Sequence, residues 1–201
     1  MIRQSDMRIY DISQEIFSGT IFKGDPVPAA IPLYRIKDGH TYNLSSVSMC
    51  LHSATHIDAP SHYIEDGPTV DQISLERCVG PCMVLTANGP IDEGLISPLL
   101  GRGAKRLLFK GKGWLTMKAA MALSQSEIVL VGTEGQTVGH GVNIDQVHRV
   151  LLENNIVILE GLVLKDVPEG NYYLVSLPLK FGGMEGSPCR AVLLDYLPPV
   201  D

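Results

Sequence analysis

The sequence predicts a single α/β domain with many strands and few helices. Short apolar stretches, rich in β-branched and aromatic residues and bounded by Gly, Pro or Asn, recur along the chain as strands do. Two segments instead repeat apolar residues with a helical period, and each is followed by a turn and a strand. No fixed-period repeat, low-complexity tract or long linker divides the chain, so we expect one domain over residues 1–201.

Eight apolar segments are expected to form strands. In chain order they are residues 8–13, 47–58, 81–87, 106–111, 128–133, 156–162, 172–179 and 190–197. The stretch "PVPAAIP" is interpreted as an irregular edge segment because proline interrupts regular structure.

Two helices are expected between these strands. The segment "TMKAAMALSQS" opens with Thr116, a capping residue, and is rich in alanine. The segment "NIDQVHRVLLEN" begins with Asn143 as its expected cap. Its apolar stripe consists of Ile144, Val147, Leu151 and Leu152.

Composition favours a cytoplasmic protein that acts on a small molecule. A formal net charge of −6 offers no clustered Lys and Arg for nucleic acid or an anionic membrane. The N-terminus lacks the apolar segment of a signal peptide, and no later run approaches the roughly 18 apolar residues of a membrane span. The four cysteines contain no CxxC pair and are too few for a disulfide framework, so we expect reduced thiols.

The stretch "HSATHIDAPSHY" holds three of the six histidines in the chain. His52, His56 and Asp58 are separated by even numbers, so on an extended strand their side chains leave one face. Ala54 would share that face and leave room between the imidazoles. Such a set suits zinc, manganese or iron with a position open for water. The alternative is that these residues are ordinary polar side chains on the solvent-facing side of an edge strand, with His62 in an unrelated turn.

A second pair of residues supports the metal hypothesis. His148 lies on the apolar stripe of its helix, so its side chain should point inward. Glu160 ends the apolar run "IVILEGL", where an ionised carboxylate is costly unless a cation or strong donors meet it. A metal would satisfy both. The alternatives are that His148 is a core histidine whose hydrogen bonds are satisfied, and that the carboxylate of Glu160 turns into solvent.

Other motifs are weaker. The segment "GTEGQTVGHG", residues 132–141, lacks the Lys of a P-loop and does not match GxGxxG, so we interpret it as a loop bordering a site. His140 within it is expected to face solvent, and Trp114 to pack at a helix start. Neither a GxSxG elbow nor a QACxG-type signature is present, which leaves a serine or cysteine nucleophile without support.

The histidine-rich stretch resembles the HxGTHxDxPxH signature of the cyclase family of metal-dependent hydrolases, which includes bacterial kynurenine formamidases and isatin hydrolases. The resemblance extends to "YDIS" near the start, the "VGTEGQTVG" loop, the spacing from His148 to Glu160, and "YYLVSLPLKFGGMEGSPCRAVLL" near the end. It therefore spans almost the whole chain. It implies a swivelling β/β/α fold with a mixed sheet and few helices.

The resemblance also implies roles for individual residues. The implied metal ligands are His52, His56, Asp58, His148 and Glu160. His62, the last histidine of the signature, resembles the catalytic residue beside the metals. One or two divalent ions per chain are implied, with zinc favoured and manganese as the other candidate. Homodimers or homotetramers whose subunits help shape each other's pockets are implied as well.

The chain departs from the formamidases at three places. Ala54 replaces the signature glycine, and Phe22 and Lys23 precede Gly-Asp-Pro where formamidases have a tryptophan and Pro-Gly-Asp. The later loop differs from the formamidase pattern at Glu134, Thr137 and Gly139. These departures are expected to alter the substrate pocket while leaving the metal ligands in place.

The hypothesis from the sequence is metal-assisted hydrolysis of an amide-type C–N bond. Candidate substrates are an N-formyl arylamine such as N-formylkynurenine, or a cyclic amide. A divalent metal lowers the pKa of bound water from 15.7 to about 7, and His62 is suited to move a proton at neutral pH. Two alternatives stay open: a non-catalytic structural or sensory metal site, and a lyase or isomerase that stabilises an enolate.

Overall fold

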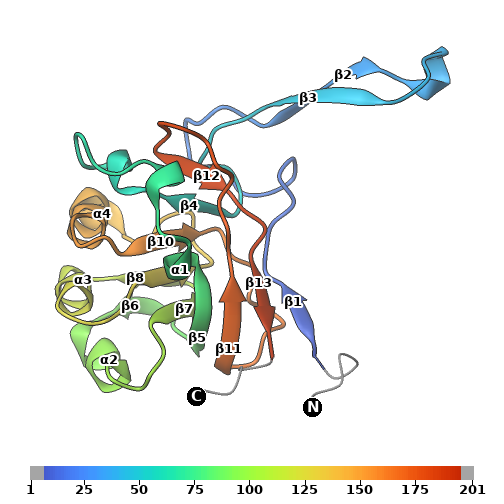
Figure 1. Ribbon diagram of the computed structural model, residues 1–201. Helices are drawn as coiled ribbons and strands as arrows, with labels where there is room; N and C mark the ends of the chain where they lie inside the picture. Colours follow the sequence, from blue (N-terminus) through green and yellow to red (C-terminus); the bar gives the residue numbers. More distant parts are fainter. Residues whose placement is uncertain (1–6, 196–201) are drawn as a thin grey trace.

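The computed structural model describes residues 7–195, and a large curled sheet of nine strands forms its centre (Figure 1). The strands of this sheet are β1 (Ile9–Asp11), β4 (His56–Asp58), β5 (Val79–Thr86), β7 (Arg106–Lys110), β9 (Leu130–Thr133), β10 (Val157–Glu160), β11 (Gly170–Val175), β12 (Gly186–Pro188) and β13 (Val192–Leu194). Their order across the sheet is β1-β13-β11-β5-β7-β9-β10-β4-β12. The four central strands β5, β7, β9 and β10 are parallel, and all other pairs in the sheet are antiparallel.

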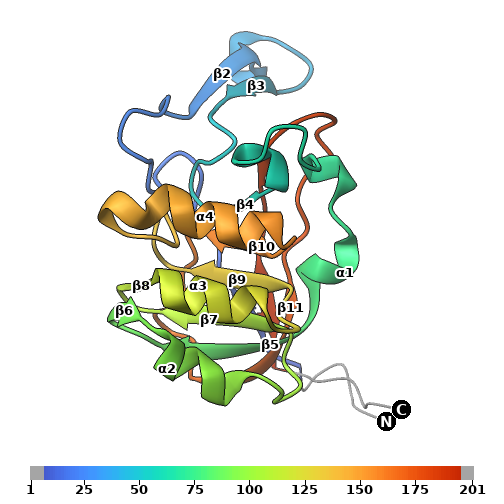
Figure 2. The same ribbon diagram turned by 90° about the vertical axis from the view of Figure 1, so that its left-hand side faces the viewer.

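Helices cover one face of the parallel strands. The α-helices are α1 (Leu75–Cys78), α2 (Glu93–Ile96), α3 (Met117–Ser124) and α4 (Ile144–Glu153). Figure 2 shows α2, α3 and α4 side by side in front of the sheet. Strands β6 (Gly89–Ile91) and β8 (Gly113–Leu115) form a small parallel pair at one end of this layer. No helix among residues 7–195 is long and apolar enough to cross a membrane.

Two hydrophobic cores flank the sheet, because alternate side chains of each strand point to opposite faces. On β7, Leu107 and Phe109 pack with the helices, whereas Leu108 packs in the second core on the far face. On β10, Ile158 likewise faces the helices and Leu159 the far face. This alternation decides which residues of β4 and β10 can meet α4.

The predicted α/β class, with a mixed sheet and few helices, is confirmed. Both expected helices form, and the Thr116 hydroxyl accepts a hydrogen bond from Ala119 N at 3.2 Å as a cap should. Asn143 stands at the cap position of α4, but its side chain makes no cap hydrogen bond, so that part of the prediction is wrong. The last predicted strand forms over Val192–Leu194; its residues 196 and 197 lie outside the described part of the chain.

A hairpin that the sequence did not predict projects from the body. Strand β2 (Ala29–Tyr34) pairs antiparallel with β3 (Leu44–Ser48), and both views show this arm extending away from the main sheet (Figures 1 and 2). The expected irregular segment "PVPAAIP" thus contains the start of a strand. Every residue of both strands is exposed. Because neither face is buried, the arm lacks the apolar alternation by which strands are recognised.

Candidate metal centre

Strands β4 and β10 are adjacent and antiparallel, and their register brings the predicted ligands together. His56 pairs directly with Glu160, and Asp58 pairs with Ile158. Side chains alternate along each strand, so His56 and Asp58 share the face on which Ile158 and Glu160 lie, which is the face covered by helices. The predicted ligand residues on the two strands therefore point toward α4.

His148 reaches the same place from α4. It lies on the buried stripe of that helix, as predicted, and is 2% exposed. Its Nε2 lies 3.2 Å from Glu160 Oε1 and 3.7 Å from Asp58 Oδ2. His56 Nε2 lies 3.4 Å from both Asp58 Oδ1 and Glu160 Oε2. Each of these four residues is at most 3% exposed.

His52 joins the cluster by a different route from the one predicted. Residues 47–58 do not form one strand: β4 begins at His56, and turns occupy the residues before it. Ala54 has φ 57°, in the left-handed region that favours glycine, which explains why the family signature has glycine there. The prediction that His52 and Ala54 share a strand face with His56 is therefore wrong. The turn nevertheless brings His52 Nδ1 to 2.8 Å from Asp58 Oδ1.

Charge in the cluster shifts the pKa of its members. Burial on its own would lower the pKa of His56, but hydrogen bonds and the charges of Asp58 and Glu160 raise it to about 10. The same balance, led by Glu160, raises the pKa of His148 to about 9. Burial opposes ionisation of Asp58, yet hydrogen bonds from His52 and His56 hold its pKa well below the usual range. The buried Asp58 carboxylate thus remains ionised opposite the imidazoles.

The donor set fits a divalent cation. Two overlapping triads, His52 with His56 and Asp58, and Asp58 with His148 and Glu160, each hold three potential ligand atoms within 4.8 Å of one another. Asp58 Oδ2 is buried and has no hydrogen-bond partner among residues 7–195. A buried carboxylate oxygen without a donor is costly unless a cation meets it. The chain binds a divalent metal, and these residues would hold it.

A cavity of about 190 Å³ is lined by His62 and by four of the five predicted ligands. His62 lies in a short 3-10 helix, Pro60–His62, immediately after β4. Its ring stacks on His52, with 4.1 Å between centroids. Burial lowers the pKa of His62, and the neighbouring His52 and His148 act in the same direction against the opposing charge of Asp58. His62 is accordingly neutral at pH 7 and can accept a proton.

Sequence reasoning missed Tyr63 as part of the cavity wall. Its ring stacks on His148, with 4.8 Å between centroids, and its hydroxyl donates to Asp145 Oδ1 at 3.3 Å. The roots of the arm contribute three more side chains to the wall: Phe22, Asp25 and Cys50. The position of Tyr63 next to His62 in the sequence was the available signal; for Asp25 and Cys50 there was none, because the arm was not predicted.

The loop of residues 132–141 borders the cavity, as expected. Gln136 and Thr137 line it, and Val138 N donates to Glu160 Oε1 at 2.8 Å. Glu134 does not contribute to the wall. Its carboxylate accepts from Gly111 N and Leu164 N, so it ties two other loops together and that part of the prediction is wrong. His140 is exposed as predicted, and Trp114 of β8 packs against it, with the rings tilted by 54° and 4.3 Å between centroids.

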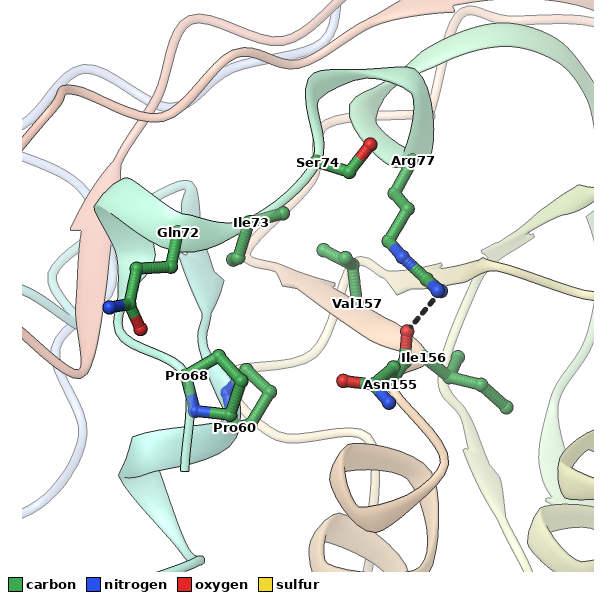
Figure 3. A pocket seen from close by; sticks show the side chains of 9 residues that line it. All are labelled: Pro60, Pro68, Gln72, Ile73, Ser74, Arg77, Asn155, Ile156 and Val157. Carbon is green, nitrogen blue, oxygen red and sulfur yellow. Dashed lines mark hydrogen bonds between the residues drawn. The ribbon is translucent and has the colours of Figure 1, made fainter. Parts of the chain in front are cut away.

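A smaller cavity is lined by Pro60, Pro68 and the residues at the start of β10 (Figure 3). It measures about 140 Å³, and none of the residues that line it is His, Cys, Asp or Glu. Arg77 donates there to the backbone oxygen of Asn155, the left-handed residue two positions before β10. This contact helps fix the start of β10, but the cavity itself has no donor set for a metal.

Comparisons with known proteins agree with this geometry. A family model described as "Putative cyclase" matches residues 10–99. A kynurenine formamidase from Erythrobacter litoralis (strain HTCC2594) is 35% identical over 205 residues, covering 94% of this chain and 95% of that protein.

Solved structures match over similar lengths. A structure described as a potential metal-dependent hydrolase with cyclase activity is 31% identical, with a TM-score of 0.82 over 96% of this chain and 100% of that one. Isatin hydrolase A from Labrenzia aggregata, bound to benzyl benzoate, is 22% identical, with a TM-score of 0.80 over 94% and 93% of the two chains. The similarity to isatin hydrolase A supports the fold only.

Proposed function

Since this chain belongs to the cyclase family of metal-dependent hydrolases, we propose that it hydrolyses the amide bond of an N-formyl arylamine, such as N-formylkynurenine, or of a cyclic amide. The observation that carries the proposal is the convergence of four buried ligand residues beside a neutral histidine in a cavity. The relatives named for formamidase activity favour the N-formyl substrate. The cavity, at about 190 Å³, is smaller than the roughly 300–1,000 Å³ of pockets for drug-sized ligands, which favours a compact substrate.

We propose the implied ligand roles for His52, His56, Asp58, His148 and Glu160. A divalent cation bound there would act as a Lewis acid toward water and toward a carbonyl oxygen. Histidine nitrogens and carboxylate oxygens suit zinc best, and manganese is the second candidate. Because the two triads share Asp58, the site accommodates one ion or two.

His62 is proposed to carry the proton transfers. It takes a proton from the attacking water and delivers one to the leaving nitrogen, which a neutral half-buried imidazole at the cavity wall can do. Asp58 stays ionised, and Tyr63 packs against His148. Phe22 lies at the outer wall, where its ring can contact an aromatic substrate.

Elemental analysis and turnover assays test this function together. We expect one or two zinc or manganese ions per chain, and hydrolysis of N-formylkynurenine or a cyclic amide such as isatin. In ¹⁸O-labelled water the new carboxylate should contain one solvent oxygen, which a lyase or isomerase reaction would not introduce. A stoichiometric metal without any hydrolysis would instead support a non-catalytic metal-binding protein.

We also propose that the protein acts in the cytoplasm as a homodimer or homotetramer. An isolated two-stranded hairpin is at best marginally stable in water, and this arm exposes Ile31, Leu33 and Ile36 by 48–58%. A second copy offers a surface to cover it: an apolar groove of about 610 Å³ lined in part by Phe17 and Leu177. The free cysteines among residues 7–195 support a reducing compartment.

A further inference from the structure

The outer nitrogens of two ligand histidines are held by backbone carbonyl oxygens. His56 Nδ1 lies 3.0 Å from Ala54 O, and His148 Nδ1 lies 2.8 Å from Ile144 O. A carbonyl oxygen can only accept, so each Nδ1 carries the proton and donates it. Both rings consequently present Nε2 to the carboxylates and to a bound cation.

His52 is oriented the other way round. Its Nδ1 faces Asp58, so Nε2 is the outer nitrogen. That Nε2 is buried and has no hydrogen-bond partner within residues 7–195. The nearest acidic group is Glu185, whose Oε1 lies 3.7 Å away and whose side chain is 42% exposed.

The backbone around Glu185 is fixed against His52. Glu185 O accepts a hydrogen bond from Ala59 N at 2.9 Å, directly after β4. At the next residue, Gly186, a Cβ atom would lie 2.7 Å from His52 Cε1 and 3.0 Å from Nε2. The absent side chain at Gly186 therefore leaves space for the ring of His52, while the flexible side chain of Glu185 reaches toward its outer edge.

We propose that Glu185 is a positioning residue for His52. Its carboxylate accepts a hydrogen bond from Nε2–H, either directly after a small side-chain rotation or through one water molecule, since 3.7 Å exceeds a direct bond. In the metal-free cluster His52 Nδ1 donates its proton to Asp58; when a cation replaces that proton, Glu185 would keep the remaining proton on Nε2 and leave the Nδ1 lone pair for the cation. Carboxylate partners of ligand histidines commonly contribute 10- to 100-fold in metal affinity, which is about the effect expected here.

Zinc titration of the whole protein tests this inference, which rests on the metal site of the proposed function. Affinity is measured by competition with a chromogenic chelator for the wild type, Glu185→Ala, Glu185→Gln and the control Glu153→Ala, an exposed carboxylate at the end of α4. We expect about 10- to 100-fold weaker binding for Glu185→Ala. Glu185→Gln, which keeps an acceptor oxygen, should recover part of the loss, and Glu153→Ala should match the wild type.

The outcomes separate the two proposals. A wild-type protein that does not bind zinc would overturn the metal site and this inference with it. A zinc-binding wild type with unchanged affinity in Glu185→Ala would overturn the inference alone. Because Glu185 is partly exposed, thermal unfolding of Glu185→Ala without metal should match the wild type.

A double-mutant cycle and the tautomer of His52 distinguish positioning from a general effect of charge. In a His52→Ala background, Glu185→Ala should cause no further loss of affinity. In zinc-loaded protein with ¹⁵N-labelled histidine, the Nε2 of His52 should show the chemical shift of a protonated nitrogen. Equal losses in both backgrounds, or a metal-bound Nε2, would refute the role proposed for Glu185.

Discussion

The ligand cluster and the arm have opposite arrangements of polar and apolar side chains. In the cluster, four polar or charged residues are at most 3% exposed, whereas in the arm every strand residue is exposed, including Ile31 and Val47. The cluster is enclosed by β4, β10 and α4, while the arm is held by contacts within itself, chiefly the pairing of its two strands. Buried charges without a counter-ion and apolar side chains in water both cost free energy. Each region therefore indicates a missing partner: a cation for the cluster and a protein surface for the arm.

The two regions meet at the cavity. Phe22 and Asp25 precede the arm and Cys50 follows it, and all three line the space beside His62. The ligand residues, in contrast, all come from the body of the fold. We therefore expect changes in the cluster to affect metal content and chemistry, and changes in the arm to affect assembly and substrate binding.

The largest effect is expected for Glu160→Ala. It removes a candidate ligand of one triad and one of the two carboxylates that lie beside both His56 and His148. Bound metal should be lost and kcat/KM should fall by more than about 10³-fold. Elemental analysis and steady-state assays measure both, with Glu153→Ala as the control. Full metal content with normal turnover would exclude Glu160 as a ligand.

His62→Ala should separate chemistry from metal binding. His62 stacks on His52 but offers no ligand atom to either triad. Turnover should fall by about 10²- to 10⁴-fold, as expected for a lost proton-transfer group, while the metal content stays that of the wild type. If metal is lost in proportion to activity, His62 belongs with the ligands.

Changes on the arm should affect assembly and spare the metal. A charge at Ile31 or Leu33 would be buried if a second copy covers the arm, so Ile31→Glu should weaken self-association by about tenfold or more. Mass measured by light scattering during size-exclusion chromatography reports this, and elemental analysis should show unchanged metal. The matched control is Lys37→Glu at the tip of the arm. Unchanged mass at low concentration would contradict the expected interface.

The metal-free protein should lose stability as the pH rises. His56 and His148 have folded pKa values of about 10 and about 9, above the unfolded value near 6.5. Their contribution is fully present below pH 6.5 and is lost as the pH passes through 9 to 10. Melting temperatures in the presence of a chelator should fall over this range. Zinc-loaded protein should show a smaller decline, because its imidazoles are already neutral.

The smallest effect is expected for Phe22→Ala. Phe22 is 44% exposed and lines the cavity, and it belongs to neither triad of candidate ligands. KM for an aromatic substrate should rise a few-fold, with kcat and metal content nearly unchanged. Phe22→Trp should restore or lower KM. A loss of kcat instead would indicate that the arm root also orders the catalytic residues.

The sequence predicted a strand or helix correctly where one buried face produces a periodic pattern of apolar residues. The strand at Val157–Glu160 and the helix at Ile144–Glu153 carry apolar periodicity, and both place their polar residue inward as expected. The turn at Ala54 was missed because even spacing suggests a strand, although the glycine of the signature at that position was a usable sign of positive φ. The arm could not be predicted, since a hairpin with both faces exposed has no apolar alternation.

The direct pairing of His56 with Glu160 joins two points of the chain that lie about a hundred residues apart. A cation that binds both residues only in the folded chain would stabilise the fold by its binding free energy, about 4 kcal/mol when the free ion is at about 1,000 times the dissociation constant. That is a large share of the stability of a typical domain. Zinc starvation of a producing cell would then reduce the amount of folded protein, in addition to the activity of each molecule.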